Sequence, residues 1–324
     1  MIKILELFGG VGSPRVALRN LGVPTKAIDY VEIDQKAVSS YNAMFANELA
    51  YKTQSVVGYD LKPDILIHGS PCQDFSIAGH QKGADKGSET RSSLMWETVR
   101  IIEEMGDWKP KYVIWENVKN VLSKHMRVNF DSYLSYMEDL GYTNSFQVLD
   151  ARDFGVPQAR ERVFTISVLN GEEFDFTKLE TKEMQPLSTL LDDDYMDCHV
   201  VTQPSILNGV GKTGTVKRTT VLNDFAYTVT TRQDRTPAQV VKISDGRYRF
   251  LTEKECWRLQ GYSDKDFFNA MKVNSAPSGK MNRTLYHQAG NSIPVPIFES
   301  LFKLILKDLG KEELIQDQVQ LSLV

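Results

Sequence analysis

Three short stretches of the sequence carry side chains that could carry out a reaction together. Cys72 follows Pro71 behind a run of apolar residues, and Glu116 ends a second apolar run. Arg160 and Arg162 alternate along a third stretch, so both side chains point the same way if that stretch is extended. A thiolate can add to an electron-poor carbon, a carboxylate can hold an amine, and arginines can steady a carboxylate or a phosphate. From its position alone, Cys72 could equally be an inert loop cysteine.

The two apolar runs are typical of buried parallel strands, which would place these side chains at one edge of a sheet. Residues 64–68 precede the loop of Cys72, and residues 111–115 precede Glu116. Reactive groups of doubly wound α/β proteins lie beyond the carboxyl ends of such strands. We therefore expect an α/β fold in which Cys72 and Glu116 share the edge of a sheet.

The N-terminal part of the chain reads as a strand, a glycine-rich turn, a helix and a second strand. The turn is Gly9-Gly10-Val11-Gly12, and Ser13 is the expected N-cap of the helix. Glu32 follows the second strand, about 20 residues beyond the turn, where a ribose-binding acid is found in nucleotide-binding folds. A dinucleotide fingerprint would need glycine at Arg15, so S-adenosylmethionine fits better than NAD. A plain tight turn with an exposed acid after the strand is the alternative.

The bulk composition is that of a globular protein and excludes several classes. The chain has 324 residues, of which 41% are hydrophobic and 25% are charged, and its net charge is −4. That balance gives no global basic footprint, although local patches can still contact phosphates. The cysteines, Cys72, Cys198 and Cys256, are too widely spaced for a zinc site or a disulfide framework. Without a signal peptide or an apolar run of roughly 18 residues, we expect a cytoplasmic protein with no membrane association.

The composition changes after Val168, which indicates a second, smaller domain. Residues 171–197 are mainly acidic, whereas residues 200–250 carry eight Lys and Arg against three Asp among short β-like runs. We interpret the basic part as a small, irregular β domain whose loops could meet phosphates and base edges, although it could be an ordinary solvated face. The expected organisation is a catalytic domain of residues 1–169 and 251–324, with the C-terminal apolar helix packing back on it, and a recognition domain of residues 170–250.

A cysteine, a carboxylate and arginines beside a nucleoside site suit methyl transfer to a weakly nucleophilic ring carbon. Cytosine C5 becomes nucleophilic when a thiolate adds at C6 and breaks the conjugation of the ring. Glu116 could hydrogen-bond the exocyclic amine and N3 of the base. The Cys72 thiol would need a lowered pKa, and a base in a duplex would have to be flipped out.

The spacing of these motifs resembles that of the DNA (cytosine-5)-methyltransferase family, from residue 4 to about residue 300. Glu6 and Ser13 stand where the family more often has Asp and Gly, and both changes leave the turn intact. The matching segments are Phe8–Gly12, Pro71-Cys72-Gln73 with Phe75-Ser76, Glu116-Asn117-Val118, the alternating Gln158, Arg160 and Arg162, Arg258–Tyr262, and Gly290-Asn291-Ser292.

The resemblance implies a role for each matching position. The implied catalytic residues are Cys72, Glu116, Arg160, Arg162, Pro71 and Gln73. The implied cofactor-binding residues are Phe8, Gly9, Gly10, Val11, Gly12, Glu32, Ile33, Asp60, Leu94, Asn291 and Ser292. The implied DNA-binding residues are Ser76, Gln158, Lys212, Thr228 and Thr230.

The resemblance also implies a Rossmann-like fold, a cofactor and partners. The cofactor would be S-adenosyl-L-methionine, leaving as S-adenosyl-L-homocysteine, and no metal would be needed. The partner would be double-stranded DNA, bound by a monomer. The setting would be a bacterial or phage-encoded modification enzyme, with or without a cognate restriction endonuclease.

Other functions share parts of this pattern. A tRNA-methylating relative would have most of these motifs, but it would also carry a Cys-Phe-Thr tripeptide that this sequence lacks. A catalytically silent DNA-binding module would not need Cys72, Glu116 and Arg160 together. A nicotinamide-dependent oxidoreductase would leave Pro71-Cys72-Gln73 without a role.

Overall fold

The computed structural model describes residues 1–46, 53, 55–57, 63–69, 94–212 and 219–316. The predicted residues Asp60, Pro71, Cys72, Gln73 and Ser76 lie outside these ranges.

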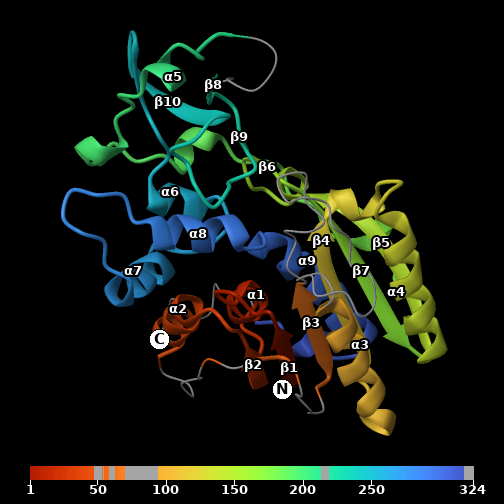
Figure 1. The fold of residues 1–324 in the computed structure, drawn as a ribbon. Helices are drawn as coiled ribbons and strands as arrows, with labels where there is room; N and C mark the ends of the chain where they lie inside the picture. Colours follow the sequence, from red (N-terminus) through yellow and green to blue (C-terminus); the bar gives the residue numbers. More distant parts are fainter. Residues whose placement is uncertain (47–52, 54, 58–62, 70–93, 213–218, 317–324) are drawn as a thin grey trace.

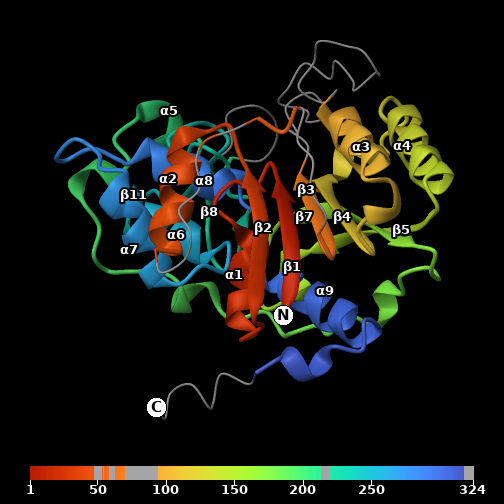
Figure 2. The ribbon, with the colours of Figure 1, turned by 90° about the horizontal axis from the view of Figure 1, so that it is seen from below.

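The largest element of the described chain is a six-stranded sheet, which confirms the predicted α/β class (Figures 1 and 2). All neighbouring strands are parallel except β7, which runs antiparallel to both of its neighbours. In spatial order the strands are β2 (Thr25–Val31), β1 (Ile2–Leu7), β3 (Ile65–Gly69), β4 (Tyr112–Val118), β7 (Glu161–Leu169) and β5 (Tyr142–Asp150).

Helices cover both faces of this sheet because its central strands are apolar on both sides. Ile4 and Ile114 belong to a core with helices α1 (Ser13–Asn20), α2 (Gln35–Met44) and α9 (Val295–Asp308). Leu5 and Trp115, one residue further along the same strands, belong to a core with α3 (Leu94–Glu104) and α4 (Arg127–Asp139). This alternation is the pattern of side chains on a strand, and it makes the sheet the middle layer of three.

A smaller region lies beside the main sheet and has its own core (Figure 1). Its sheet has the order β11 (Arg247–Arg249), β10 (Ala238–Ser244) and β8 (Thr219–Val221), and the short helix α5 (Pro204–Leu207) lies near it. The core of this region contains Val201, Ile206, Ala238, Val240 and Phe250.

Two connections join the smaller region to the main sheet. The short strands β6 (Gln158–Ala159) and β9 (Ala226–Tyr227) pair in parallel. After β11 the chain forms α6 (Glu253–Arg258), α7 (Asp264–Val273) and α8 (Arg283–Asn291) before returning to the sheet with α9. Short 3-10 helices span Gly106–Trp108, Lys119–Leu122, Ala151–Asp153, Phe176–Lys178, Leu187–Thr189, Asp197–His199 and Glu312–Leu314.

The chain leaves the main core later than the change in composition suggests. Phe174, Phe176 and Leu187 pack in the same core as α9, and Ser300 of that helix donates a hydrogen bond to the Glu180 carbonyl. The first part of the acidic stretch after residue 170 therefore packs against the main core.

Ser13 does not cap α1 as the sequence predicts. Gly12 occupies the N-cap with a φ of 82°, and no side chain makes the capping hydrogen bond. A left-handed residue is accessible to glycine without strain, so the turn enters the helix through Gly12 and leaves the Ser13 hydroxyl available for another partner.

In the part of the chain that the structure describes, no helix has both the length and the apolar character needed to cross a membrane.

The glycine turn generates a first prediction. A Cβ on Gly12 would lie 2.5 Å from the Tyr41 ring, whereas a Cβ on Gly10 would meet nothing within 4 Å, although both residues have positive φ. We expect Gly10→Ala to lower the free energy of unfolding by about 1 kcal/mol through backbone strain alone, and Gly12→Ala by about 3 kcal/mol because the ring must also move. Urea denaturation without cofactor measures both. Equal losses would contradict the packing argument.

Candidate active site at the sheet edge

A pocket opens at the carboxyl end of β1, between the first and last parts of the chain. The glycine turn supplies one wall through Phe8, Gly9, Gly10 and Val11, and the segment after α8 supplies another. The complete lining is Glu6, Leu7, Phe8, Gly9, Gly10, Val11, Ser13, Pro14, Ile67, Gly69, Asn291, Ser292 and Ile293. The fold thus brings together residues that are nearly 300 positions apart and that the sequence assigns to one cofactor.

Tyr30 and Tyr41 pack against the glycine turn. The Tyr30 hydroxyl donates a hydrogen bond of 2.6 Å to the Gly10 carbonyl, and its ring stacks on Tyr41 at 3.8 Å. A Cβ on Gly9 would lie 2.5 Å from the Tyr30 ring, so glycine is required for this close approach. The turn is rigid as a result.

The acid after β2 is bound to the turn. The Glu32 carboxylate accepts hydrogen bonds of 2.7 to 2.9 Å from the backbone N–H groups of Gly10, Ile33 and Asp34. The Ile33 side chain is 75% exposed, although it is a large aliphatic group. The exposed apolar side chain can pack against the planar base of a nucleoside. The carboxylate beside it can accept hydrogen bonds from the hydroxyl groups of the sugar.

Leu94 is the first residue of α3, is half-buried, and is not among the residues that line this pocket. The predicted contact of Gly12 is also indirect, since Gly12 N–H donates to the Gly9 carbonyl and shapes the turn.

A buried acid that the sequence marked only as an unusual residue lies in the pocket wall. Glu6 is 1% exposed, and its Oε2 accepts a hydrogen bond of 2.8 Å from the Tyr41 hydroxyl. Arg15 donates in turn to that hydroxyl at 2.9 Å. Glu6 Oε1 has no hydrogen-bond partner. Burial raises the pKa of Glu6 to about 7, with the Tyr41 hydrogen bond and Arg15 opposing the shift.

The carboxylate of Glu116 lies at the end of β4, where the sequence predicts it. Arg162 Nε lies 3.1 Å from Glu116 Oε1, and both side chains are largely buried. Burial raises the pKa of Glu116, while Arg162 and then Arg160 act in the opposite direction. The pair is therefore a carboxyl group held in place by a cation, with a pKa above its ordinary value.

Gly69 is the register partner of Glu116 across β3 and β4. A Cβ on Gly69 would lie 3.8 Å from Glu116 Oε2, so the backbone of β3 ends directly beside the carboxylate. Cys72 follows Gly69 by three positions in the sequence and lies outside the described residues.

Arg160 and Gln158 are buried and bind backbone groups of this chain. The Arg160 guanidinium donates to the carbonyls of Val229, Gly290 and Ser292 at 3.0, 2.9 and 2.7 Å. The Gln158 amide donates to the Leu259 carbonyl at 2.7 Å and accepts from the Val229 N–H at 2.8 Å. Gln158 is 0% exposed, so the predicted contact between this side chain and DNA has no surface available in this conformation.

The other predicted DNA contacts that the structure describes, Lys212, Thr228 and Thr230, lie on or near the surface. The Thr228 hydroxyl donates to the Ala159 carbonyl at 2.9 Å, which anchors β9 to β6. Thr230 is exposed, with its hydroxyl donating to the Arg232 carbonyl at 2.6 Å. Lys212 is exposed. Thr230 and Lys212 can therefore meet a large partner without rearrangement.

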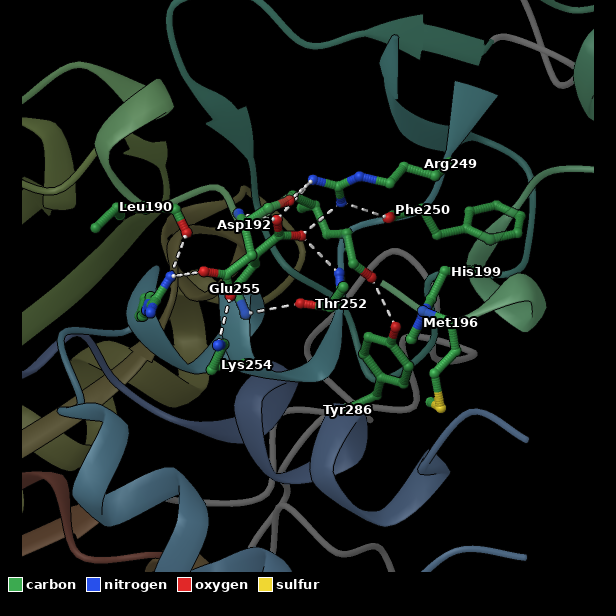
Figure 3. A network of polar contacts seen from close by, with 12 residues as sticks. Leu190, Asp192, Met196, His199, Arg249, Phe250, Thr252, Lys254, Glu255 and Tyr286 are labelled. Carbon is green, nitrogen blue, oxygen red and sulfur yellow. Dashed lines mark hydrogen bonds and ion pairs between the residues drawn. The ribbon is translucent and has the colours of Figure 1, made fainter. Parts of the chain in front are cut away.

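A network of charges connects the smaller region to α6 (Figure 3). Arg249 donates to both oxygens of Glu255 at 2.8 Å, and both side chains are buried. Asp192 pairs with Lys254 at 2.7 Å and with Arg258 at 2.9 Å. The sequence showed only that residues 171–197 are mainly acidic, and gave no indication that Asp192 would meet the basic residues of α6.

The described ranges contain no group of three or more histidine, cysteine, aspartate and glutamate side chains that could hold a metal ion.

The buried Glu6 generates a prediction about pH. Its carboxyl has a pKa of about 7 in the folded chain against 4.5 ordinarily, so the unfolded state loses this proton first as the pH rises. Its contribution to stability is full below pH 4.5 and is lost as the pH rises through 7. We expect the wild type to lose up to about 3 kcal/mol more stability than Glu6→Gln between pH 5 and pH 8. Denaturant titrations at both pH values measure this difference, and parallel profiles would refute it.

The three carbonyl contacts of Arg160 generate another prediction. Arg160→Lys can keep at most part of this set, and the buried carbonyls left without donors should cost about 2 to 4 kcal/mol in the free energy of unfolding. Arg152→Lys is the matched control, because Arg152 is 40% exposed and pairs with Asp150 at the surface. We expect it to cost less than about 1 kcal/mol. Similar losses in the two variants would show that Arg160 does not fasten these segments.

The sequence matches a known protein family over most of its length. A family model described as C-5 cytosine-specific DNA methylase matches residues 2–307. The type II methyltransferase M2.ScrFI of Lactococcus lactis subsp. cremoris is 34% identical over 372 residues, which cover 95% of this chain and 99% of that protein. The type II methyltransferase M.Bsp6I of Bacillus sp. (strain RFL6) is 29% identical over 331 residues, covering 95% and 100%.

Solved structures share the fold at low sequence identity. The crystal structure of the S. pombe Dnmt2 methyltransferase has a TM-score of 0.73 and 19% identity, and the match covers 95% of this chain and 99% of that one. A putative DNA modification methyltransferase encoded within an E. coli prophage has a TM-score of 0.70 and 18% identity over 96% of this chain and all of that one. With the family match over nearly its whole length, the chain belongs to the C-5 cytosine-specific DNA methylases.

Proposed function

We propose that this protein transfers a methyl group from S-adenosylmethionine to C5 of a cytosine flipped out of duplex DNA within a short specific sequence. The reaction proceeds through a covalent bond between the Cys72 sulfur and C6 of the base. One observation carries the proposal: the pocket at the glycine turn, the Glu116 carboxylate and the end of β3 that leads to Cys72 meet at one edge of the sheet.

The pocket fits the cofactor that the family uses. Its lining joins the glycine turn to Asn291 and Ser292, residues that the sequence assigns to one cofactor. Glu32 and Ile33 are not among the residues that line the pocket, but the exposed Ile33 side chain suits the adenine and the Glu32 carboxylate suits the ribose hydroxyls. When bound, S-adenosylmethionine supplies an electrophilic methyl group. We assign Phe8, Gly9, Gly10, Val11, Gly12, Glu32, Ile33, Asn291 and Ser292 to this site, with Asp60 and Leu94 as further contacts.

The side chains of this protein make cytosine C5 reactive. The Cys72 thiolate forms a bond to C6, and the electron pair of the C5–C6 double bond moves into the ring toward N3. Glu116, whose pKa is raised by burial, can hold a proton for N3 and accept a hydrogen bond from the exocyclic amine. Arg162 fixes the orientation of Glu116. Transfer of the methyl group to C5 would release S-adenosylhomocysteine. Loss of the C5 proton to water and expulsion of the Cys72 thiolate from C6 then restore the C5–C6 double bond and the aromatic base.

The recognition of DNA is assigned to the smaller region. The proposed domain of residues 170–250 presents Lys212 and Thr230 at the surface. The hydrogen bonds of Gln158 and Arg160 to the Val229 backbone fix it against the sheet edge. The modest net charge of −4 suits a compact footprint bound by a monomer. Relatives named type II methyltransferases suggest a bacterial cytoplasm or a phage-infected cell as the setting and a restriction endonuclease as a companion.

Labelled S-adenosylmethionine tests the proposal directly. Wild-type protein should transfer label to unmethylated duplex DNA and not to tRNA, and Cys72→Ser should lower transfer by at least about a thousandfold. Cys198→Ser is the matched control, because Cys198 is a partly buried free cysteine that does not line the pocket, so this variant should leave transfer intact.

Duplex DNA containing 5-fluorocytosine tests the covalent step. Fluorine cannot leave C5 as a cation, so wild-type protein should remain bonded to the DNA through denaturing electrophoresis, and Cys72→Ser should not. Label in tRNA alone, or transfer that survives Cys72→Ser, would overturn the proposed function.

A further inference from the structure

Three hydroxyl groups from distant parts of the chain meet in the wall of the pocket. Ser13 Oγ lies 2.7 Å from the Tyr262 hydroxyl, which lies 3.3 Å from Ser292 Oγ. Ser13 and Ser292 line the pocket from opposite ends of the sequence, and Tyr262 comes from the segment after α6. All three residues are buried, so each hydroxyl depends on its neighbours for hydrogen bonds.

The hydrogen bonds among these three hydroxyl groups can run in only one direction. Ser292 Oγ donates to the Gln288 carbonyl at 2.7 Å, so it can only accept from Tyr262. The single proton of Tyr262 is then committed to Ser292, and Ser13 must donate to Tyr262. The Ser13 hydroxyl is free for this bond because Gly12 is the N-cap of α1. Such a chain of oriented hydroxyls is cooperative, since each bond polarises the next.

The ring of Tyr262 is held firmly, which makes its hydroxyl a fixed point. The ring packs against Trp257 at 4.9 Å, and Trp257 Nε1 donates to the Leu285 carbonyl at 3.0 Å. The preceding Gly261 has a φ of 84°, and a Cβ there would lie 2.5 Å from Pro296, so the turn cannot shift freely. The helix α6 that carries Trp257 is anchored to the smaller region through Arg249 and Glu255 (Figure 3).

We propose that Tyr262 is a positioning residue for the cofactor: its hydroxyl joins the Ser13 wall to the Ser292 wall and sets the width of the pocket. This inference rests on the proposed function for the identity of the ligand. Without the hydroxyl, the two walls lose their shared hydrogen-bond partner. Part of the free energy of cofactor binding is then spent on bringing the walls together, which lowers the affinity. Cofactor affinity should therefore depend on Tyr262, whereas the chemical step at saturating cofactor should not.

Tyr262→Phe tests the proposal, with Tyr286→Phe as a matched control. Tyr286 is equally buried and its hydroxyl donates to the Leu251 carbonyl at 2.6 Å, away from the residues that line the pocket. We expect Tyr262→Phe to raise the calorimetric Kd for S-adenosylmethionine about three- to tenfold, with kcat on DNA within about twofold of the wild type. Tyr286→Phe should lower thermal stability by a similar amount without changing Kd.

Ser13→Ala provides a second, independent variant. If the hydroxyls act as one unit, Ser13→Ala and Tyr262→Phe should each raise Kd, and the double variant should raise it less than the product of the two effects. Unchanged Kd in Tyr262→Phe, a loss in kcat alone, or an equal rise in Tyr286→Phe would overturn the inference. Wild-type protein that binds no S-adenosylmethionine would overturn the proposed function as well, so the two failures are distinguishable.

Discussion

The backbone of Val229 is held between two buried side chains, and the arrangement of the whole site depends on this clamp. Gln158 accepts from its N–H and Arg160 donates to its carbonyl, while Arg160 also binds the carbonyls of Gly290 and Ser292. Buried backbone groups must be paired, so none of these bonds can be given up without cost. A single guanidinium thereby fixes the recognition region and the closing segment of the pocket to the edge of the main sheet.

The pocket also depends on contacts between distant parts of the chain. Its two walls come from the first and last parts of the chain, which meet only because α1 and α9 pack on the same face of the sheet. Buried polar groups, namely the carboxylate of Glu6 and the hydroxyls of Ser13 and Tyr262, lie where the walls join. Stability and ligand binding are therefore linked through the same buried contacts.

Much of this site could be predicted from the sequence, because glycine turns and strand-end acids leave local signals. The turn at Gly9–Gly12 and the placement of Glu116 follow from such signals, and the α/β class is confirmed. Side chains that bind backbone carbonyls leave no such signal, since every residue has a carbonyl. The alternation of Gln158 and Arg160 therefore indicated a shared direction but not that it was inward. Ser13 was wrongly expected to cap α1, because a left-handed Gly12 took that place.

The identity of the methylated product tests most directly whether Glu116 acts on cytosine. Duplex DNA treated with the protein and labelled S-adenosylmethionine would be digested to nucleosides, beside a Glu116→Gln variant whose cofactor affinity is verified by calorimetry. We predict that all label elutes as 5-methyl-2′-deoxycytidine for the wild type, and that transfer by Glu116→Gln falls at least about a hundredfold. Label in a methylated exocyclic amine, or undiminished transfer by Glu116→Gln, would contradict the account.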